Sequence, residues 1–289
     1  FDPDPKLLAL VEQALQEKHN QYAPMQGIFS LREAIAEKIE SLYGNSYHPE
    51  SEITVTAGAT QAIFTAIAAF VNPGDEVIVF KPAYDCYEPA IALQGGTVVP
   101  IALKGQHFSI DWIEVQSKVT ANTKMVIINT PHNPSGTILS QEDMLQLQAI
   151  LEGTDCILLS DEVYEHIVFD GCSHESAAKY PGLSERSILC ASFGKTFHVT
   201  GWKVGYVAGP KVLMEEFNKV HQFNVFCVNH PIQKALATYL KDPNHYLYLG
   251  EFYEEKRNYF LAALNDSKFQ FTPAQGTYFQ TVDYSDISD

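Results

Sequence analysis

Residues 124–160 read KMVIINTPHNPSGTILSQEDMLQLQAILEGTDCILLS, and this stretch decides the fold class. Two short apolar runs, Lys124–Asn129 and Cys156–Ser160, lie on either side of a helical pattern at Ser140–Leu151. Short runs that stay apolar without alternation are typical of strands buried on both faces. A strand, a helix and a second strand in this order predict parallel strands with a helix packed on the sheet.

The same alternation extends over most of the chain. Further strands are expected at Ile53–Thr56, Glu76–Phe80, Thr97–Ile101, Ser187–Ala191 and Trp202–Ala208. Helices are expected at Thr60–Val71, Tyr84–Leu93 and Ile110–Val119. The pattern predicts an α/β protein of three layers, α/β/α, in which helices cover both faces of a mostly parallel mixed sheet.

The flanking segments carry further signals. Ser30-Leu31-Arg32-Glu33 predicts a capping box that opens a helix ending near Gly44. A long helical region is expected from the end of the last of these strands to about Asn265. Phe269–Phe271 and Thr277–Val282 are expected to be strands.

Composition narrows the range of partners and compartments. The net charge of −16, from 19 basic and 35 acidic residues, argues against a nucleic-acid partner and indicates a solvated surface. The longest apolar stretch, from about Ala62 to Val71, is too short to span a bilayer, so we expect no membrane partner. Five cysteines without a C-x-x-C pair favour reduced thiols in a cytoplasmic protein. Residues 1–5, FDPDP, do not resemble a signal peptide.

Function is expected in the loops that follow the strands, because ligands of such sheets bind beyond the carboxyl ends of the strands. Lys195 lies in one of these loops, in Ala191-Ser192-Phe193-Gly194-Lys195-Thr196. A lysine that forms an imine must lose its proton, and a neighbouring positive charge such as Lys203 favours that loss. The alternatives are a solvated loop lysine at Lys195 and an exposed strand lysine at Lys203.

Asp161 ends the apolar run in Leu159-Ser160-Asp161-Glu162-Val163-Tyr164. A carboxylate at such a position is costly unless it meets a cation or hydrogen-bond donors. The protonated ring nitrogen of a pyridine cofactor is such a cation, and the pairing makes the ring an electron sink. Tyr164 would then bond the phenolic oxygen of the ring. The alternative is a helix N-cap at Asp161.

Two more loops offer donors to anionic oxygens. Thr56-Ala57-Gly58-Ala59-Thr60 joins a strand to a helix, where small residues let backbone N–H groups and the helix dipole face a phosphate. The two prolines of Asn129-Thr130-Pro131-His132-Asn133-Pro134-Ser135-Gly136 predict a rigid turn that holds Asn133 toward an anionic oxygen. A helix N-cap without a ligand and an ordinary turn asparagine are the alternatives.

The order and spacing of these motifs resemble the fold-type I, class I and II aminotransferases that use pyridoxal 5′-phosphate. The resemblance extends from Asn20-Gln21-Tyr22 to Gly276-Thr277-Tyr278-Phe279. It implies that Lys195 holds the cofactor as a Schiff base and that Asp161 pairs with the pyridinium nitrogen. It further implies that Asn133 and Tyr164 bond the ring oxygen and that Tyr84 stacks on the ring. The phosphate is expected among Gly58, Ala59, Thr60, Ser192 and Lys203.

The resemblance also implies a homodimer, because Tyr22 matches a tyrosine that reaches the phosphate in the neighbouring subunit. Phe193–Tyr206 and Tyr84–Pro89 look most like the methionine and kynurenine–glutamine branch of the family. Lys203 stands where most of the class has an arginine, as in that branch, and still offers a point charge.

By the same resemblance, residues 1–272 are expected to form the large cofactor-binding domain, with a leading helix within residues 1–20. Residues 273–289 are expected to begin a small C-terminal domain. The family's N-terminal arm and most of its small domain have no counterpart in this sequence, so the chain looks truncated at both ends. The family's arginine for the substrate carboxylate lies in that part, and neither Arg186 nor Arg257 matches its motif.

The implied activity is ping-pong transfer of the amino group of an L-amino acid, of the methionine or aromatic and kynurenine type, to a 2-oxo acid. Lys195 would take the proton from the substrate Cα. A cysteine-conjugate β-lyase and a non-catalytic aminotransferase-like domain stay open as alternatives. A metal hydrolase built on Asp161, Glu162 and His166 is a third, if Glu162 and His166 share a helix face. No second histidine lies nearby at ligand spacing, and we assign no metal ligand.

Overall fold

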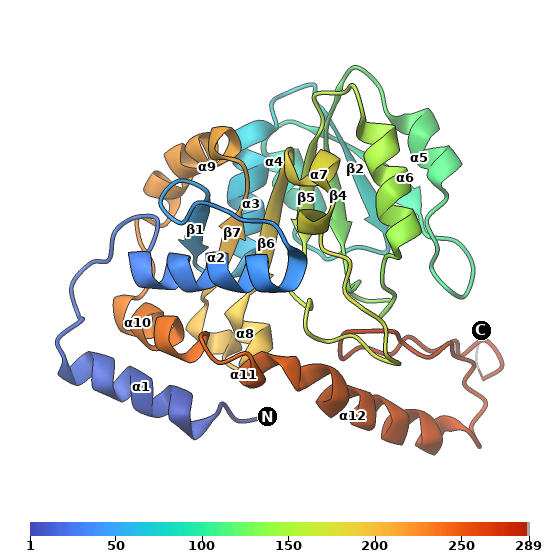
Figure 1. The fold of residues 1–289 in the computed structure, drawn as a ribbon. Coiled ribbons are helices and arrows are strands. Elements are labelled where there is room, and N and C mark those ends of the chain that lie inside the picture. Colours follow the sequence, from blue (N-terminus) through green and yellow to red (C-terminus); the bar gives the residue numbers. More distant parts are fainter. Residues whose placement is uncertain (288–289) are drawn as a thin grey trace.

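The computed structural model describes residues 1–287 and contains one mixed sheet of seven strands (Figure 1). The strand order is β1-β7-β6-β5-β4-β2-β3. Only β7 runs antiparallel to its neighbours, so the predicted mostly parallel mixed sheet is confirmed. The strands are β1 Ile53–Thr56, β2 Glu76–Lys81, β3 Thr97–Ala102, β4 Thr123–Asn129, β5 Ile157–Asp161, β6 Ser187–Ser192 and β7 Gly205–Ala208.

Helices cover both faces of this sheet, because alternate side chains of the buried strands point to opposite sides. In β4, Val126 and Ile128 join one apolar core, while Met125 and Ile127 join the other. The first core is covered by α2 Phe29–Tyr43, α5 Trp112–Lys118, α6 Gln141–Leu151 and α7 Pro181–Ser184. The second is covered by α3 Ala59–Phe70, α4 Tyr87–Leu93 and α9 Lys211–Asn224. The three-layer α/β/α architecture is therefore confirmed.

The predicted long helical region to Asn265 is broken into separate helices. They are α9, α10 His230–Tyr239, α11 Asn244–Leu247 and α12 Leu249–Leu264. Pro231 lies in the first turn of α10 and Pro243 directly precedes α11, in positions where proline starts a helix and cannot continue one. The N-terminal helix α1 Pro5–Gln16 packs against α10, and Tyr239 donates a hydrogen bond to Asp4 at 2.8 Å.

The predicted capping box at Ser30 is wrong, although its helix and the end at Gly44 are confirmed. The helix α2 begins at Phe29, so Ser30 already lies inside it. The backbone N–H of Ile28, the N-cap residue, donates instead to the side chain of Gln233 at 2.9 Å. A distant residue therefore satisfies the backbone N–H of the actual N-cap residue.

Three other predicted elements differ from the structure. Within the described residues 1–287, neither Phe269–Phe271 nor Thr277–Val282 forms a strand. Gln270 makes only an isolated bridge with Asp283, and Gly276 makes one with Val168. Thr277 has a left-handed φ of 64° that turns the chain. Trp202 belongs to a 3₁₀ turn, Thr200–Trp202, so β7 begins only at Gly205. The helix predicted at Tyr84–Leu93 begins later in the structure, because residues 84–86 precede α4. Residues 288–289, the end of the predicted C-terminal segment, lie outside the described residues.

Two short elements complete the fold. They are the 3₁₀ turn Ala177–Lys179 and the helix α8 Phe193–Thr196, which follows β6. None of the helices within residues 1–287 combines the length and the apolar character that crossing a membrane requires.

Candidate active site

A cavity of about 360 Å³ lies at the edge of the sheet where β1, β2, β4, β5 and β6 end. The antiparallel strand β7 begins at the same edge, so Lys203, which precedes β7, also reaches the cavity. The structure brings all the predicted cofactor residues except Tyr22 to its walls. They are Gly58, Ala59, Thr60, Tyr84, Asn133, Asp161, Tyr164, Ser192, Lys195 and Lys203.

One end of the cavity is suited to an anion. The helix α3 begins here with Gly58 as its N-cap, so the first backbone N–H groups of a twelve-residue helix and its dipole are available. Lys203 lies over this turn, because a Cβ added at Gly58 would be 3.8 Å from its Cε. The hydroxyl groups of Thr60 and Tyr84 are hydrogen-bonded at 3.0 Å beside it.

The start of β7 passes very close to this turn. A Cβ added at Gly205 would lie 2.5 Å from the carbonyl oxygen of Ala191 and 3.2 Å from the carbonyl carbon of Gly58. Glycine is therefore required at position 205 for β6, β7 and the start of α3 to meet. This close approach places Lys203, two residues earlier, against the anion end of the cavity.

The Asp161 carboxylate lies in the floor of the cavity and is 3% exposed. Burial raises the pKa of Asp161 to about 6, although a hydrogen bond from the Tyr87 hydroxyl, at 2.6 Å, acts to lower it. The backbone N–H of Val163 also donates to this carboxylate, at 3.3 Å. The interpretation of Asp161 as a helix N-cap is wrong, because the following residues form a turn rather than a helix.

Tyr87 is a site residue that the sequence interpretation missed. It is 2% exposed and reaches Asp161 from the first turn of α4. Burial raises the pKa of Tyr87 well above its usual value, and the charge of Asp161 adds to this effect, so the phenol stays protonated and donates. Tyr87 lies three residues after the predicted Tyr84. A second tyrosine at this spacing near the start of the helix was the signal that could have indicated a role for Tyr87.

Asn129, at the end of β4, is a second missed residue. Its side-chain amide donates to the backbone carbonyl of Asp161 at 2.9 Å and accepts from the backbone N–H of Asn133 at 2.7 Å. One buried side chain thus ties together the loops after β4 and β5, which carry Asn133, Asp161 and Tyr164. A polar residue at the last position of an apolar run was the signal for it.

Lys195 extends into the cavity from α8. Its Nζ donates to the Tyr278 hydroxyl at 2.8 Å, and the Tyr164 hydroxyl donates to the same oxygen at 3.4 Å. Burial, together with the bond to Tyr278, raises the pKa of Tyr164, which therefore stays a phenol. Tyr278 is a third residue of this site that the sequence motifs do not indicate.

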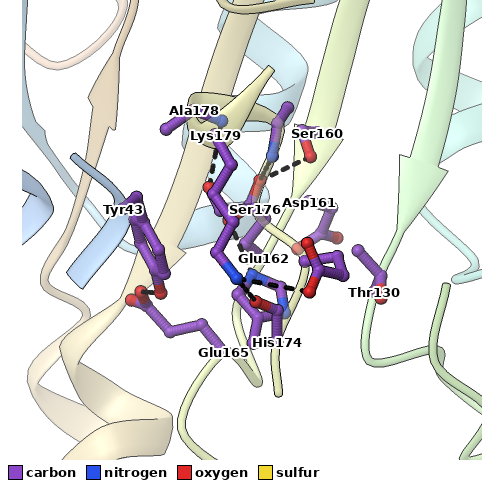
Figure 2. Close-up of polar contacts among 12 residues, drawn as sticks. Tyr43, Thr130, Ser160, Asp161, Glu162, Glu165, His174, Ser176, Ala178 and Lys179 are labelled. Carbon is purple, nitrogen blue, oxygen red and sulfur yellow. Dashed lines mark hydrogen bonds and ion pairs between the residues drawn. The ribbon is translucent and has the colours of Figure 1, made fainter. Parts of the chain in front are cut away.

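The segment after β5 is anchored by polar contacts with residues that do not line the cavity (Figure 2). The buried Glu162 carboxylate accepts hydrogen bonds from Ser160 Oγ at 2.7 Å, from His174 Nε2 at 2.8 Å and from the backbone N–H of Ala177 at 3.0 Å. Because three groups occupy this carboxylate, Glu162 serves to hold the segment in place.

Glu165 forms the second anchor of this segment. Lys38 and Tyr43, both from α2, donate to its carboxylate at 2.5 Å each. Burial alone would raise the pKa of Glu165, but Lys38, His166 and Tyr43 together lower it to about 2. Breaking such a buried pair by removing one partner is strongly destabilising, so α2 fixes the segment that carries Asp161 and Tyr164.

The helix face on which the metal-hydrolase alternative depends is absent from the described chain, because residues 162–166 form turns. His166 is buried, its ring centroid lies 4.6 Å from that of Tyr246, and burial lowers its pKa to about 3. Glu162 is engaged by its three donors. This interpretation is therefore not supported.

The remaining residues named from the sequence lie elsewhere. Tyr22 is 81% exposed and packs edge-on against Phe226, with ring centroids 5.2 Å apart. Arg257 forms a two-pronged pair with Asp170 at 2.6 and 2.7 Å. Arg186 donates to backbone carbonyls, including that of Thr154 at 2.7 Å. Neither arginine belongs to the cavity wall.

Comparison with known proteins connects this geometry to a family. A family model described as aminotransferase class I and II matches residues 3–288. The methionine aminotransferase of Escherichia coli is 51% identical over 270 residues, which are 93% of this chain and 70% of that protein. The human kynurenine–oxoglutarate transaminase 1 is 33% identical over 287 residues, covering 93% of this chain and 68% of that protein.

Solved structures agree with these matches. The crystal structure of Escherichia coli YbdL, described as having a methionine aminotransferase function, has a TM-score of 0.98 at 49% identity. The match covers 100% of this chain and 77% of the YbdL chain. A mutant of the Thermus thermophilus aspartate aminotransferase has a TM-score of 0.94 at 30% identity, over 100% of this chain and 80% of that one.

The buried carboxylate predicts a pH dependence of stability in protein free of small-molecule ligands. The pKa of Asp161 in the folded state, about 6, lies above its usual value of 3.8, so the folded state binds more protons than the unfolded state. Stability from this group is therefore present below about pH 4 and lost as the pH rises through about 6. Asp161→Asn removes this titration and keeps an acceptor for Tyr87.

We expect the free energy of unfolding of Asp161→Asn, relative to the parent, to rise by roughly 1 kcal/mol between about pH 5 and pH 8. Denaturant unfolding at several pH values measures this difference. Asp266→Asn, at an exposed position, is the matched control and should show no such trend. A difference that stays constant with pH would contradict the assignment of a raised pKa to Asp161.

Proposed function

Because the chain belongs to the class I and II aminotransferase family and is a pyridoxal-phosphate-dependent aminotransferase, we propose that Lys195 binds the cofactor covalently and that methionine or an aromatic amino acid is the preferred amino donor. The observation that carries this proposal is the convergence of Lys195, Lys203 and the buried Asp161 on one cavity. Transfer to a 2-oxo acid completes the reaction.

The anion end of the cavity fits the phosphate of the cofactor. The start of α3 supplies backbone N–H groups, the Thr60 side chain supplies a hydroxyl, and Lys203 supplies a positive charge. Ser192 lies at the same wall, between β6 and α8. We assign the phosphate to these residues, as the family resemblance implied.

The floor of the cavity fits the pyridine ring. A buried carboxylate whose pKa is raised by burial is stabilised by a cation, and the protonated ring nitrogen is one. Asn133 and Tyr164 would bond the ring oxygen, and Tyr84 would lie against the ring face. Tyr164 is a protonated phenol in this structure and can therefore donate. When bound, the cofactor supplies an electron sink that stabilises a carbanion at the substrate Cα.

Lys195 is then the residue that moves the proton. Its Nζ, when not attached to the cofactor, would be the base that removes the proton from the substrate Cα. Asp161 would hold the ring nitrogen in its protonated form. The segment from Asp161 to Tyr164 cannot shift easily, because Glu162 and Glu165 are anchored behind it.

The preference for methionine or an aromatic donor is supported by the relatives and by the wall of the cavity. The matched proteins include enzymes named for methionine, kynurenine and aromatic amino acids. Tyr84, Tyr164 and Phe279 give the cavity an aromatic wall that favours apolar or aromatic side chains.

We also propose a homodimer in which Tyr22 completes the partner's site. The exposed ring of Tyr22 lies outside its own cavity and can reach another subunit. Its ring packs against Phe226, which is 46% exposed, and Phe223, three residues earlier in the chain, is 85% exposed. Such a patch is typical of a surface that another chain covers.

A cytoplasmic location is the remaining part of the proposal. All five cysteines are free thiols in the structure. Burial raises the pKa of Cys86, which lies close to the cavity, to about 12, so this thiol stays protonated. Unpaired cysteines are typical of a reducing compartment.

Lys195→Ala tests the assignment of the lysine. With pyridoxal phosphate, the parent protein should show the visible absorption of a lysine-bound cofactor and convert methionine to its 2-oxo acid. The variant should lose that absorption and at least about 1,000-fold of the turnover, because its base and its covalent attachment are both removed. Lys219→Ala, at an exposed position on α9, is the matched control. Turnover by Lys195→Ala close to that of the parent would overturn the proposal.

Subunit mixing tests the role of Tyr22. Tyr22→Phe should bind the cofactor more weakly, and Lys195→Ala should be inactive. A dimer with one subunit of each kind contains one complete site, with Lys195 from one chain and Tyr22 from the other. Co-expressed variants assayed at limiting cofactor should recover about a quarter of the parent activity if subunits pair at random. Activity no higher than the sum of the separate variants would contradict a shared site.

A further inference from the structure

We propose that Tyr278 is a positioning residue for Lys195, holding the free amine of this lysine toward the reacting centre. The inference depends on the proposed role of Lys195 and adds to it a residue outside the set that the family resemblance implied. It starts from one contact, the 2.8 Å hydrogen bond from Lys195 Nζ to the Tyr278 hydroxyl.

Lys195 needs such a partner because its side chain is long and only half-buried. A lysine has several rotatable bonds, so holding it in one arrangement costs rotamer entropy. In the structure Nζ lies 5.5 Å from the ring centroid of Tyr278 and 5.9 Å from that of Tyr164. Two aromatic rings and one hydroxyl therefore define where the amine sits.

Tyr278 is itself held firmly. The backbone N–H of Thr277 donates to the carbonyl of Ile167 at 3.0 Å, and a Cβ added at Gly276 would lie 2.6 Å from the same oxygen. The Tyr278 ring packs against Tyr164 and Phe279, with centroids 5.3 and 4.8 Å apart. Because Ile167 closely follows the anchored Asp161–Glu165 segment, Tyr278 keeps a fixed relation to Asp161 and Tyr164.

Tyr278 affects Lys195 as a hydrogen-bond acceptor. A phenol has one donor and two acceptor positions, and the Tyr278 oxygen accepts from Lys195 and from Tyr164. A neutral amine that donates one N–H to this oxygen keeps its lone pair for another direction. Tyr278 thus orients the lone pair of the base, and the longer bond from Tyr164 would give way when the single O–H of Tyr164 donates to the cofactor.

The contact is a property of this side chain and not of an aromatic ring in general, because phenylalanine would keep the packing and lose the acceptor. Tyr278→Phe is therefore the informative variant. At 41% exposure, Tyr278 can lose its hydroxyl with little effect on folding, because solvent reaches the space that the hydroxyl leaves. Tyr259→Phe, an 81% exposed tyrosine on α12, is the matched control.

The first measurement uses protein freed of its cofactor. On mixing with pyridoxal phosphate, the rate at which the visible absorption of the lysine-bound cofactor appears reports how readily Lys195 Nζ attacks. We expect Tyr278→Phe to slow this capture about tenfold, the effect of one lost hydrogen bond, with little change in the melting temperature. Tyr259→Phe should capture the cofactor at the parent rate.

The second measurement follows the proton. When methionine carries deuterium at Cα, Lys195 removes this atom more slowly than hydrogen. The ratio of the two turnover rates is the isotope effect. This ratio does not depend on the fraction of the protein that is folded. A misdirected base makes proton removal more rate-limiting, so the isotope effect should be larger in Tyr278→Phe than in the parent. A purely structural role of Tyr278 would leave the ratio unchanged.

The two proposals fail in distinguishable ways. If Lys195→Ala is inactive but Tyr278→Phe matches the parent in capture rate and isotope effect, the positioning role is overturned and the role of Lys195 stands. If Lys195→Ala keeps its activity, both proposals are overturned. Slower capture together with a larger isotope effect supports both.

Discussion

A carboxylate buried at the end of a parallel strand is the constraint on which the rest of this site depends. Asp161 is almost inaccessible to solvent, and burial raises its pKa to about 6. Such a group is stabilised only by donors and a cation. Tyr87 supplies a donor. Under the proposed function, the ring nitrogen of the cofactor would supply the cation.

The short segment after β5 performs two tasks on its two sides. Asp161 and Tyr164 face the cavity, while Glu162 and Glu165 are held by His174 and Lys38 on the other side. Two buried carboxylates with complete sets of partners keep the backbone of this segment fixed. The reacting groups thus keep their positions without help from the substrate, as a site that moves a proton requires.

The sequence was sufficient for the sheet and for most of the cavity, because both depend on local patterns. Strands buried on two faces leave apolar runs, and the loops that follow them carry Gly58, Asn133, Asp161 and Lys195. The features that the sequence did not predict depend on contacts between residues far apart in the chain. The N-cap of α2 is satisfied by Gln233, 205 residues away, and Tyr87 meets Asp161 across 74 residues. Lys195 and Tyr278 are 83 residues apart, and no local pattern in either segment indicates that they meet.

The central claim is that Lys195 is the residue that holds the cofactor, and chemical trapping tests it most directly. The protein with bound pyridoxal phosphate is reduced with borohydride, digested and examined by mass spectrometry, so that the attached residue keeps a permanent label. The account predicts the label on the peptide that contains Lys195. A label on Lys203, the other lysine of the cavity, or on a lysine outside it would contradict the account.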